Sequence, residues 1–276
     1  MPVRIVQSKQ NARLKELRRA LASPGRSESG LVGIEGPHLL GEALRTGLRI
    51  ACDFAAEGPE RLLDEISLPA DVEVLQMPKE LLRSALATET PQLVAALIEP
   101  PAWTWGNLLN NGSTPLILVL AGLQDPGNLG TIVRSAEAFG SAGMLCLPGT
   151  VHAWNPKAVR ASAGSVFRVP ILTASASDAV IRLQEAGVRL FAAEVHSAEP
   201  AHLVNLAQPV ALLIGNEGAG VPPNLAARAD GAITIPCSGP VESLNAAVAA
   251  SVLLYEASRQ RASQNGASKR LRGGTR

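Results

Sequence analysis

The fold class follows from residues 116–139, which read LILVLA (116–121), GLQDPG (122–127) and NLGTIVRSAEAF (128–139). Six consecutive apolar residues without alternation are typical of a strand that is buried on both faces. The segment Asn128–Phe139 predicts a helix, which Gly140 ends. A buried strand, a short polar loop and a helix together indicate one unit of a parallel α/β sheet.

The rest of the second half repeats this alternation. Strands are expected at Met144–Leu147, Val188–Ala193, Val210–Ile214 and Ala232–Ile235, and helices at Pro156–Ala163, Ala176–Ala186 and Ser243–Arg259. Such a pattern predicts an α/β domain with a mostly parallel sheet and helices on both faces. We place this domain at residues 115–262 and expect the tail, 263–276, to be disordered.

The first 98 residues predict a smaller α/β domain, joined to the second by a turn-rich linker at 99–114. It begins with a basic helix over Asn11–Leu21, which Ser23-Pro24-Gly25 ends. Further elements are expected at Leu31–Ile34, Pro37–Leu44, Ile50–Ala55, Glu60–Ile66, Val72–Leu75, Lys79–Ala85 and Val94–Ile98.

The net charge of +1 over 276 residues conceals an uneven distribution. Residues 1–26 and 257–276 each carry +6, whereas the 230 residues between them carry −11. This excludes a uniformly basic, histone-like chain but allows a polyanionic partner that meets the two ends.

Composition excludes several classes. No apolar run approaches the roughly 20 residues of a membrane span, and no apolar run follows the basic start as in a secretory signal, so a cytoplasmic protein is expected. Three scattered cysteines and four histidines lack metal-ligand spacing, so no metal is expected. An aromatic content of 3% disfavours a base-stacking RNA-binding sheet.

Three loops follow predicted strands, where ligands bind in parallel α/β domains: Leu123–Arg134, Gly215–Pro222 and Ile235–Asn245. Each loop taken alone also has a structural interpretation. Asn128 and Ser243 could be helix N-caps, and the glycines could form an ordinary turn. The glycines at 215, 218 and 220 are not GxGxxG, and no GxxxxGK[ST] occurs, which disfavours a Rossmann oxidoreductase and excludes an NTPase loop.

Taken together, the motifs Asn128-x-Gly130-x-x-x-Arg134, Gly215-Asn216-Glu217-Gly218 and Glu242-Ser243-Leu244-Asn245 resemble those of the SpoU (TrmH-like) branch of the SPOUT methyltransferases. The stretch Asn155–Ser165 is similar to that branch as well. The first 98 residues resemble its substrate-binding domain through Lys9-Gln10-Asn11, Ile34-Glu35-Gly36-Pro37 and Thr90-Pro91-Gln92. One departure is Leu93, where many members have glycine.

The resemblance implies an enzyme that transfers a methyl group from S-adenosylmethionine (AdoMet) to a ribose 2′-OH, on a homodimer whose second domain contains a trefoil knot. It implies catalytic roles for Arg134, Asn128, Glu217, Ser243 and Asn245, and cofactor contacts for Gly215, Asn216, Gly218, Ile235, Pro236, Ser243 and Leu244. Because a guanidinium stays protonated, we interpret Arg134 as a stabilising cation instead of a general base.

RNA is the expected partner, and the appended first domain favours ribosomal over transfer RNA. Candidate RNA-binding residues are Arg13, Lys15, Arg18, Arg19, Lys157 and Arg160. The first four also fit a solvated amphipathic helix with no RNA role. Alternatives to the leading hypothesis are the same chemistry on transfer RNA and a non-catalytic RNA-binding protein.

Overall fold

The computed structural model describes residues 2–22, 27–57, 68–88, 90–110, 114–196, 198–240 and 243–273, the last nine by backbone alone. The expected turn Ser23–Gly25 and helix Glu60–Ile66 lie outside these residues. The chain forms two compact units: Met1–Ala102 with His152–Arg168, and Trp103–Val151 with Val169–Arg276. The division near residue 102 falls in the expected linker, but the segment 152–168 belongs with the first unit.

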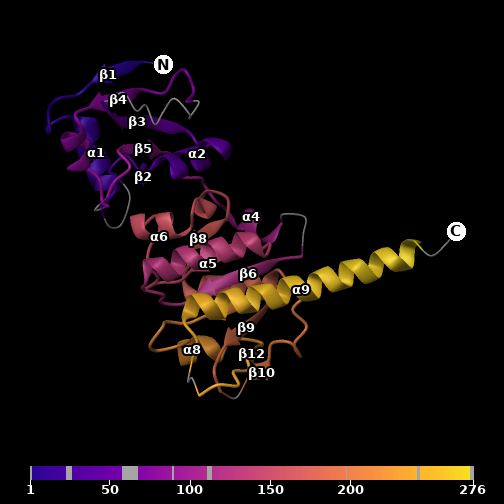
Figure 1. Ribbon diagram of the computed structural model, residues 1–276. Coiled ribbons are helices and arrows are strands. Elements are labelled where there is room, and N and C mark those ends of the chain that lie inside the picture. Colours follow the sequence, from indigo (N-terminus) through magenta and orange to yellow (C-terminus); the bar gives the residue numbers. More distant parts are fainter. Residues whose placement is uncertain are drawn as a thin grey trace. The chain divides into compact units, whose positions relative to one another are not determined.

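The first unit is built on a mixed five-stranded sheet of order β1-β4-β3-β5-β2 (Figure 1). Its strands are β1 (Val3–Ile5), β2 (Val32–Glu35), β3 (Ile50–Ala56), β4 (Val74–Met77) and β5 (Val94–Ile98). Its helices are α1 (Ala12–Ala20), α2 (Pro37–Arg45), α3 (Lys79–Arg83), α6 (Pro156–Ala161) and the 3₁₀ turn η1 (Ser165–Phe167). Only β1, three exposed residues long, lacked a sequence prediction among these strands.

Packing explains why 152–168 joins the first unit. Gly164 adopts φ +90°, and a Cβ there would lie 2.7 Å from Cβ of Glu42 on α2. The Glu42 carboxylate also pairs with Arg168, and Arg45 contributes to holding the pKa of that carboxyl below its ordinary value. The close approach therefore depends on glycine at 164.

The second unit contains a seven-stranded sheet of order β10-β12-β9-β11-β6-β7-β8, in which all pairings are parallel. Its strands are β6 (Leu116–Leu120), β7 (Gly143–Cys146), β8 (Ile171–Thr173), β9 (Arg189–Ala193), β10 (Glu199–Pro200), β11 (Val210–Ile214) and β12 (Gly231–Thr234). The expected α/β class and parallel sheet are confirmed. The knot stays a prediction.

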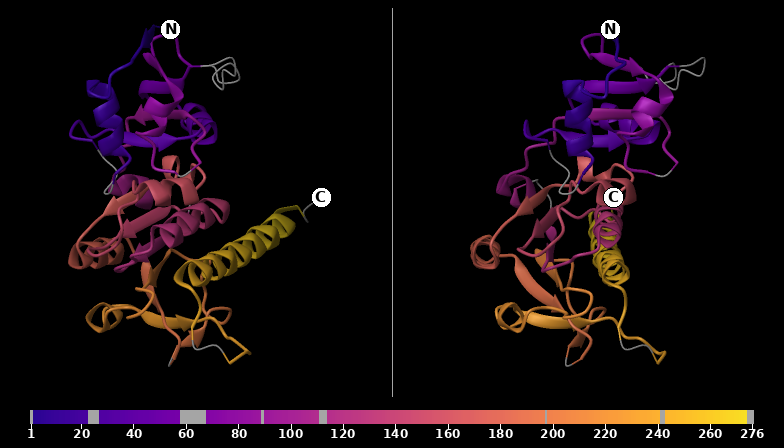
Figure 2. Two further views of the ribbon diagram at one scale, coloured as in Figure 1. Left: turned by 60° about the vertical axis from the view of Figure 1, so that its left-hand side comes forward. Right: turned by 90° about the vertical axis from the view of Figure 1, so that its left-hand side faces the viewer.

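Helices cover both faces of this sheet, as the alternation predicts. One face packs against α4 (Trp105–Leu109), α7 (Ala176–Glu185) and α8 (Pro223–Ala226). On the other face, α5 (Pro126–Ala138) and α9 (Ala246–Gly273) lie side by side, as Figures 1 and 2 show. The hydroxyls of Ser135 and Ser251 join these two helices at 2.7 Å.

Helix ends are where the structure corrects the sequence predictions. Helix α5 begins two residues early, because Pro126 suits the first turn and Asp125, not Asn128, accepts the capping N–H at 2.7 Å. Asn245, not Ser243, accepts from the amides of Ala247 and Val248 at the start of α9. The side chains of Asn128 and Ser243 therefore do not cap these helices and can make other contacts.

Two further differences concern segments expected to lack regular structure. Helix α4 lies inside the expected linker, where Thr104 and Asn107 form a capping box. Helix α9 continues to Gly273, through most of the tail expected to be disordered. The alanines, arginines and lysine there are good helix formers, and extending an existing helix avoids the cost of nucleation.

Candidate active site

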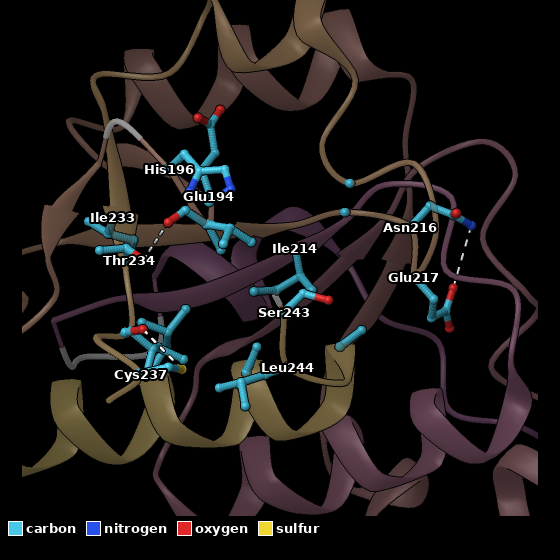
Figure 3. A pocket seen from close by; sticks show the side chains of 18 of the residues that line it. Glu194, His196, Ile214, Asn216, Glu217, Ile233, Thr234, Cys237, Ser243 and Leu244 are labelled. Carbon is cyan, nitrogen blue, oxygen red and sulfur yellow. Dashed lines mark hydrogen bonds between the residues drawn. The ribbon is translucent and has the colours of Figure 1, made fainter. Parts of the chain in front are cut away.

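A pocket of about 630 Å³ opens at the carboxyl ends of β9, β11 and β12, against the first turns of α9. All seven residues predicted to contact the cofactor line it: Gly215, Asn216, Gly218, Ile235, Pro236, Ser243 and Leu244. Figure 3 shows Glu194, His196 and Thr234 grouped on one side of the pocket and Asn216 with Glu217 on the other. The structure thus brings together loops that are up to about 50 residues apart in sequence.

Gly215 is required by the backbone of its own loop. A Cβ at this position would lie 2.1 Å from the carbonyl carbon of Gly220 and 2.3 Å from the Val221 nitrogen. The loop is closed by reciprocal backbone hydrogen bonds between Asn216 and Gly220, at 3.0 and 2.9 Å. Gly215 is therefore needed because the chain itself approaches its Cα so closely.

Asn216 fixes this glycine loop with both ends of its amide. Its Oδ1 accepts from the N–H groups of Gly218 and Ala219, and its Nδ2 donates to the Gly122 carbonyl at 2.8 Å. The Gly122 N–H in turn donates to Oγ1 of Thr150 at 3.1 Å. Through its N–H and its C=O, Gly122 therefore joins the loops that follow β7, β6 and β11, three neighbouring strands.

Glu217 is the centre of a polar network. Its carboxylate accepts from Nδ2 of Asn128 at 3.0 Å and, over longer distances, from the backbone N–H groups of Gln124 and Asp125 and from Asn216. Partial burial opposes ionisation, but these donors prevail and lower the pKa of Glu217 below its ordinary value. Asn245 extends this hydrogen-bond network, because its Nδ2 donates to Oδ1 of Asn128 at 3.1 Å.

The catalytic set predicted from sequence is therefore only partly gathered around the pocket. Glu217 and Ser243 line it, and Asn128 and Asn245 reach it through the Glu217 network. Arg134 does not line it: the side chain is exposed on α5, and no described residue of this chain forms an ion pair or hydrogen bond with it. The site of a single chain lacks its predicted cation.

The pocket fits a nucleoside-type cofactor. Side chains such as Ile214, Ile233, Leu244 and Leu253 supply an apolar wall, and the glycine loop supplies exposed backbone groups. The volume is within the ordinary range for small-molecule sites. Among the described residues, no group of three or more His, Cys, Asp or Glu side chains could hold a metal ion.

Sequence reasoning missed several lining residues. Glu194 and His196 follow β9, and Thr234 and Cys237 flank the end of β12. A signal for Glu194 existed, since it directly follows a predicted buried strand in a parallel sheet. Thr150 lies outside the lining but holds the Gly122 loop. No sequence signal marked it, because this hydrogen bond joins residues 28 positions apart.

The candidate RNA-binding residues all belong to the first unit. On α1, Arg13 pairs with Glu16, Arg19 pairs with Glu28, and Arg18 donates to the Lys9 carbonyl and to Ser84. Lys15 and Lys157 are exposed, and Arg160 is half-buried. Three of the four cations on α1 therefore have partners within the chain, so their part in RNA binding stays a prediction.

No described helix is long and apolar enough to cross a membrane.

Comparison with protein families assigns both halves of the chain. The SpoU rRNA Methylase family matches residues 115–255, and the MRM3-like substrate binding domain matches residues 11–96. The chain is 30% identical over 91% of its length, and 97% of the relative's, to the 23S rRNA (guanosine(2553)-2′-O)-methyltransferase RlmP of Bacillus subtilis strain 168.

Solved structures agree. The SpoU methyltransferase AviRb of Streptomyces viridochromogenes in complex with AdoMet is 29% identical, with a TM-score of 0.82 over 92% of this chain and 99% of that one. An AdoMet-bound rRNA methyltransferase from Sinorhizobium meliloti is 31% identical, with a TM-score of 0.80 over 93% and 98% of the two chains. The chain belongs to the SpoU rRNA Methylase family and is an AdoMet-dependent RNA methyltransferase.

Proposed function

We propose that this enzyme methylates the ribose 2′-OH of one nucleotide in ribosomal RNA and that it does so as a homodimer. The observation that carries the proposal is the Asn245–Asn128–Glu217 network, which meets the wall of the pocket at Glu217. Support for ribosomal RNA comes from the RlmP relative and from the matched substrate-binding domain.

The chemical difficulty of the reaction is the weakly acidic 2′-OH. When bound, AdoMet supplies an electrophilic methyl on its sulfonium. The chain must hold the hydroxyl in line with that methyl and stabilise the negative charge that develops on oxygen. In this proposal Arg134 stabilises that charge and binds the adjacent phosphate, while water or a phosphate oxygen accepts the proton.

The homodimer accounts for the position of Arg134. Its exposed guanidinium, with no described partner in its own chain, would complete the site of a second subunit. On α9, next to α5, Val248, Val252 and Tyr255 form a stripe with 48%, 40% and 55% of their surfaces exposed. Covering this stripe with a second copy would remove apolar surface from water. A catalytically competent monomer in sedimentation experiments would contradict the dimer.

Mapping of 2′-O-methyl groups in ribosomal and transfer RNA, with and without the gene, tests the substrate. Loss of one ribosomal site is expected, and loss confined to transfer RNA would contradict the proposal. Transfer of labelled methyl from AdoMet to the RNA fragment so identified separates this enzyme from a non-catalytic RNA-binding relative, which would bind the fragment without turnover.

A further inference from the structure

The pocket contains two carboxylates, and their surroundings differ. Glu217 is held by Asn128, by Asn216 and by two backbone N–H groups, so its acceptor positions are occupied. Glu194 lies across the pocket, and no described residue donates a hydrogen bond to its side chain. It is thus the acidic side chain in the described lining that remains available to a ligand.

The position of Glu194 is fixed by the sheet. It directly follows β9, between β11 and β12, and its backbone N–H donates to the carbonyl of Ile233 at 2.9 Å. The registers of these strands place it level with Gly215 and Thr234 at the carboxyl edge. The sheet therefore fixes the backbone of this half-buried residue at the edge of the pocket.

We propose that Glu194 binds the ribose of AdoMet by accepting hydrogen bonds from its 2′- and 3′-hydroxyls. A vicinal diol offers two donors side by side, and a carboxylate offers two matching acceptors. Parallel α/β domains that bind dinucleotides use an acidic side chain after a strand in the same way. His196 and Thr234 lie beside Glu194 in the pocket, but neither side chain offers two acceptor oxygens on one group, as a carboxylate does.

The cofactor also carries donors on its α-ammonium group and on the adenine amino group, and analogues distinguish these from the ribose hydroxyls. We would titrate wild type and Glu194→Gln with S-adenosylhomocysteine, which has both groups, and with 5′-methylthioadenosine, which has the ribose but no amino acid. Loss of a charge-assisted hydrogen bond predicts about a tenfold weaker Kd for both ligands in the variant. The 2′-deoxy analogue of methylthioadenosine should bind wild type more weakly, with a smaller difference for the variant.

Glu199→Gln is the matched control, because Glu199 is exposed on β10 and does not line the pocket. Its Kd values should equal those of wild type, and both variants should keep the wild-type melting temperature. If Glu194→Gln weakened only S-adenosylhomocysteine, the carboxylate would bind the ammonium and the ribose assignment would be wrong. If neither Kd changed, Glu194 would have no contact with the cofactor, which would also overturn the proposal.

Discussion

The pocket loops and the centre of the first sheet place acidic side chains in opposite surroundings. In the loops, Asn128, Asn216 and Glu217 each have partners, and the donors around Glu217 lower its pKa. In the first sheet, Asp53 on β3 is fully buried between Val74 and Ala96, and neither carboxylate oxygen has a partner among the described residues. Burial raises the pKa of Asp53 to about 7.

Glu217 is exposed and has donors, whereas Asp53 is buried and its carboxylate oxygens have no hydrogen-bond partner among the described residues, so the two pKa values move in opposite directions. Four donors keep Glu217 ionised and position the loops that carry the site. At Asp53 burial outweighs the attraction of the neighbouring Phe54 backbone N–H, so the carboxyl favours its neutral form, and ionising it costs stability. The contacts of Glu217 serve the candidate site directly. The burial of Asp53 instead makes the stability of the first unit depend on pH.

The largest effect should come from breaking the ordered loop at its tightest point. Gly215→Ala puts a Cβ within 2.1 Å of the Gly220 backbone, so the loop must open and the pocket wall is lost. We expect AdoMet binding to fall at least about 100-fold by calorimetry, roughly the effect of losing two good hydrogen bonds. Gly239→Ala is the control, since nothing lies within 4 Å of its Cβ. Normal binding by Gly215→Ala would contradict the steric argument.

Arg134→Ala tests whether methyl transfer needs the Arg134 cation, which lies outside the pocket of its own chain. Removing one group that stabilises a developing oxyanion typically lowers kcat about 10²–10³-fold. Because Arg134 does not line the pocket, the Kd for AdoMet should not change. Single-turnover methylation and calorimetry measure the two quantities. Near-normal activity of Arg134→Lys, with RNA binding intact, would show that the planar guanidinium is not needed.

Asp53→Asn tests the unpartnered side of the comparison. The pKa is about 7 in the folded chain and 3.8 ordinarily, so the wild type should lose stability as pH rises from about 4 to 7 and remain level above that. The variant should lack this contribution and be more stable at pH 8, by on the order of 3 kcal/mol. Chemical denaturation of both proteins at several pH values measures the difference. Parallel curves for the two proteins would mean that Asp53 stays ionised when folded.

Lys15→Gln tests the predicted RNA contact with the least structural disturbance. Truncation of residues 1–20 would remove Leu14, Leu17 and Ala20 from the core, whereas Lys15 is exposed. One lost phosphate contact should reduce the slope of log K against log salt by about 0.7–0.9. Filter binding at several salt concentrations measures this slope. Lys79→Gln on α3 is a control of equal charge change, and equal effects of both variants would mean nonspecific attraction.

The smallest effect is expected at Leu93, a half-buried residue with a positive φ. Leu93 has φ +51°, a conformation that costs a branched L-residue roughly 1 kcal/mol. Leu93→Gly relieves this backbone strain but loses part of a half-buried side-chain contact. The two effects oppose each other, so the change in unfolding free energy should stay below about 1 kcal/mol. Val94→Gly, next to it but fully buried on β5, should cost about 3 kcal/mol. Equal losses would contradict the strain at 93.

Local sequence patterns were sufficient for most elements. The LILVLA run predicted β6 as a buried strand, and apolar spacing predicted α2, α7 and β11 nearly to their ends. Asn128 and Ser243 were possible caps, and neither caps its helix, because several polar residues near a helix start can cap it and only the chain path selects one. β1 was missed since three exposed residues carry no periodicity.

The sequence by itself determined the α/β class, the two halves of the chain, the family and the loops that form the pocket. Only the tertiary structure decided which residues meet around the pocket: Glu217 with Asn128, Gly122 with Thr150 and Asn216, and a Glu194 side chain that no described residue contacts by a hydrogen bond. Periodicity and motifs arise from local geometry, which a sequence records directly. Hydrogen bonds between loops and the burial of Asp53 depend on the order of strands in the sheets, which no local pattern specifies.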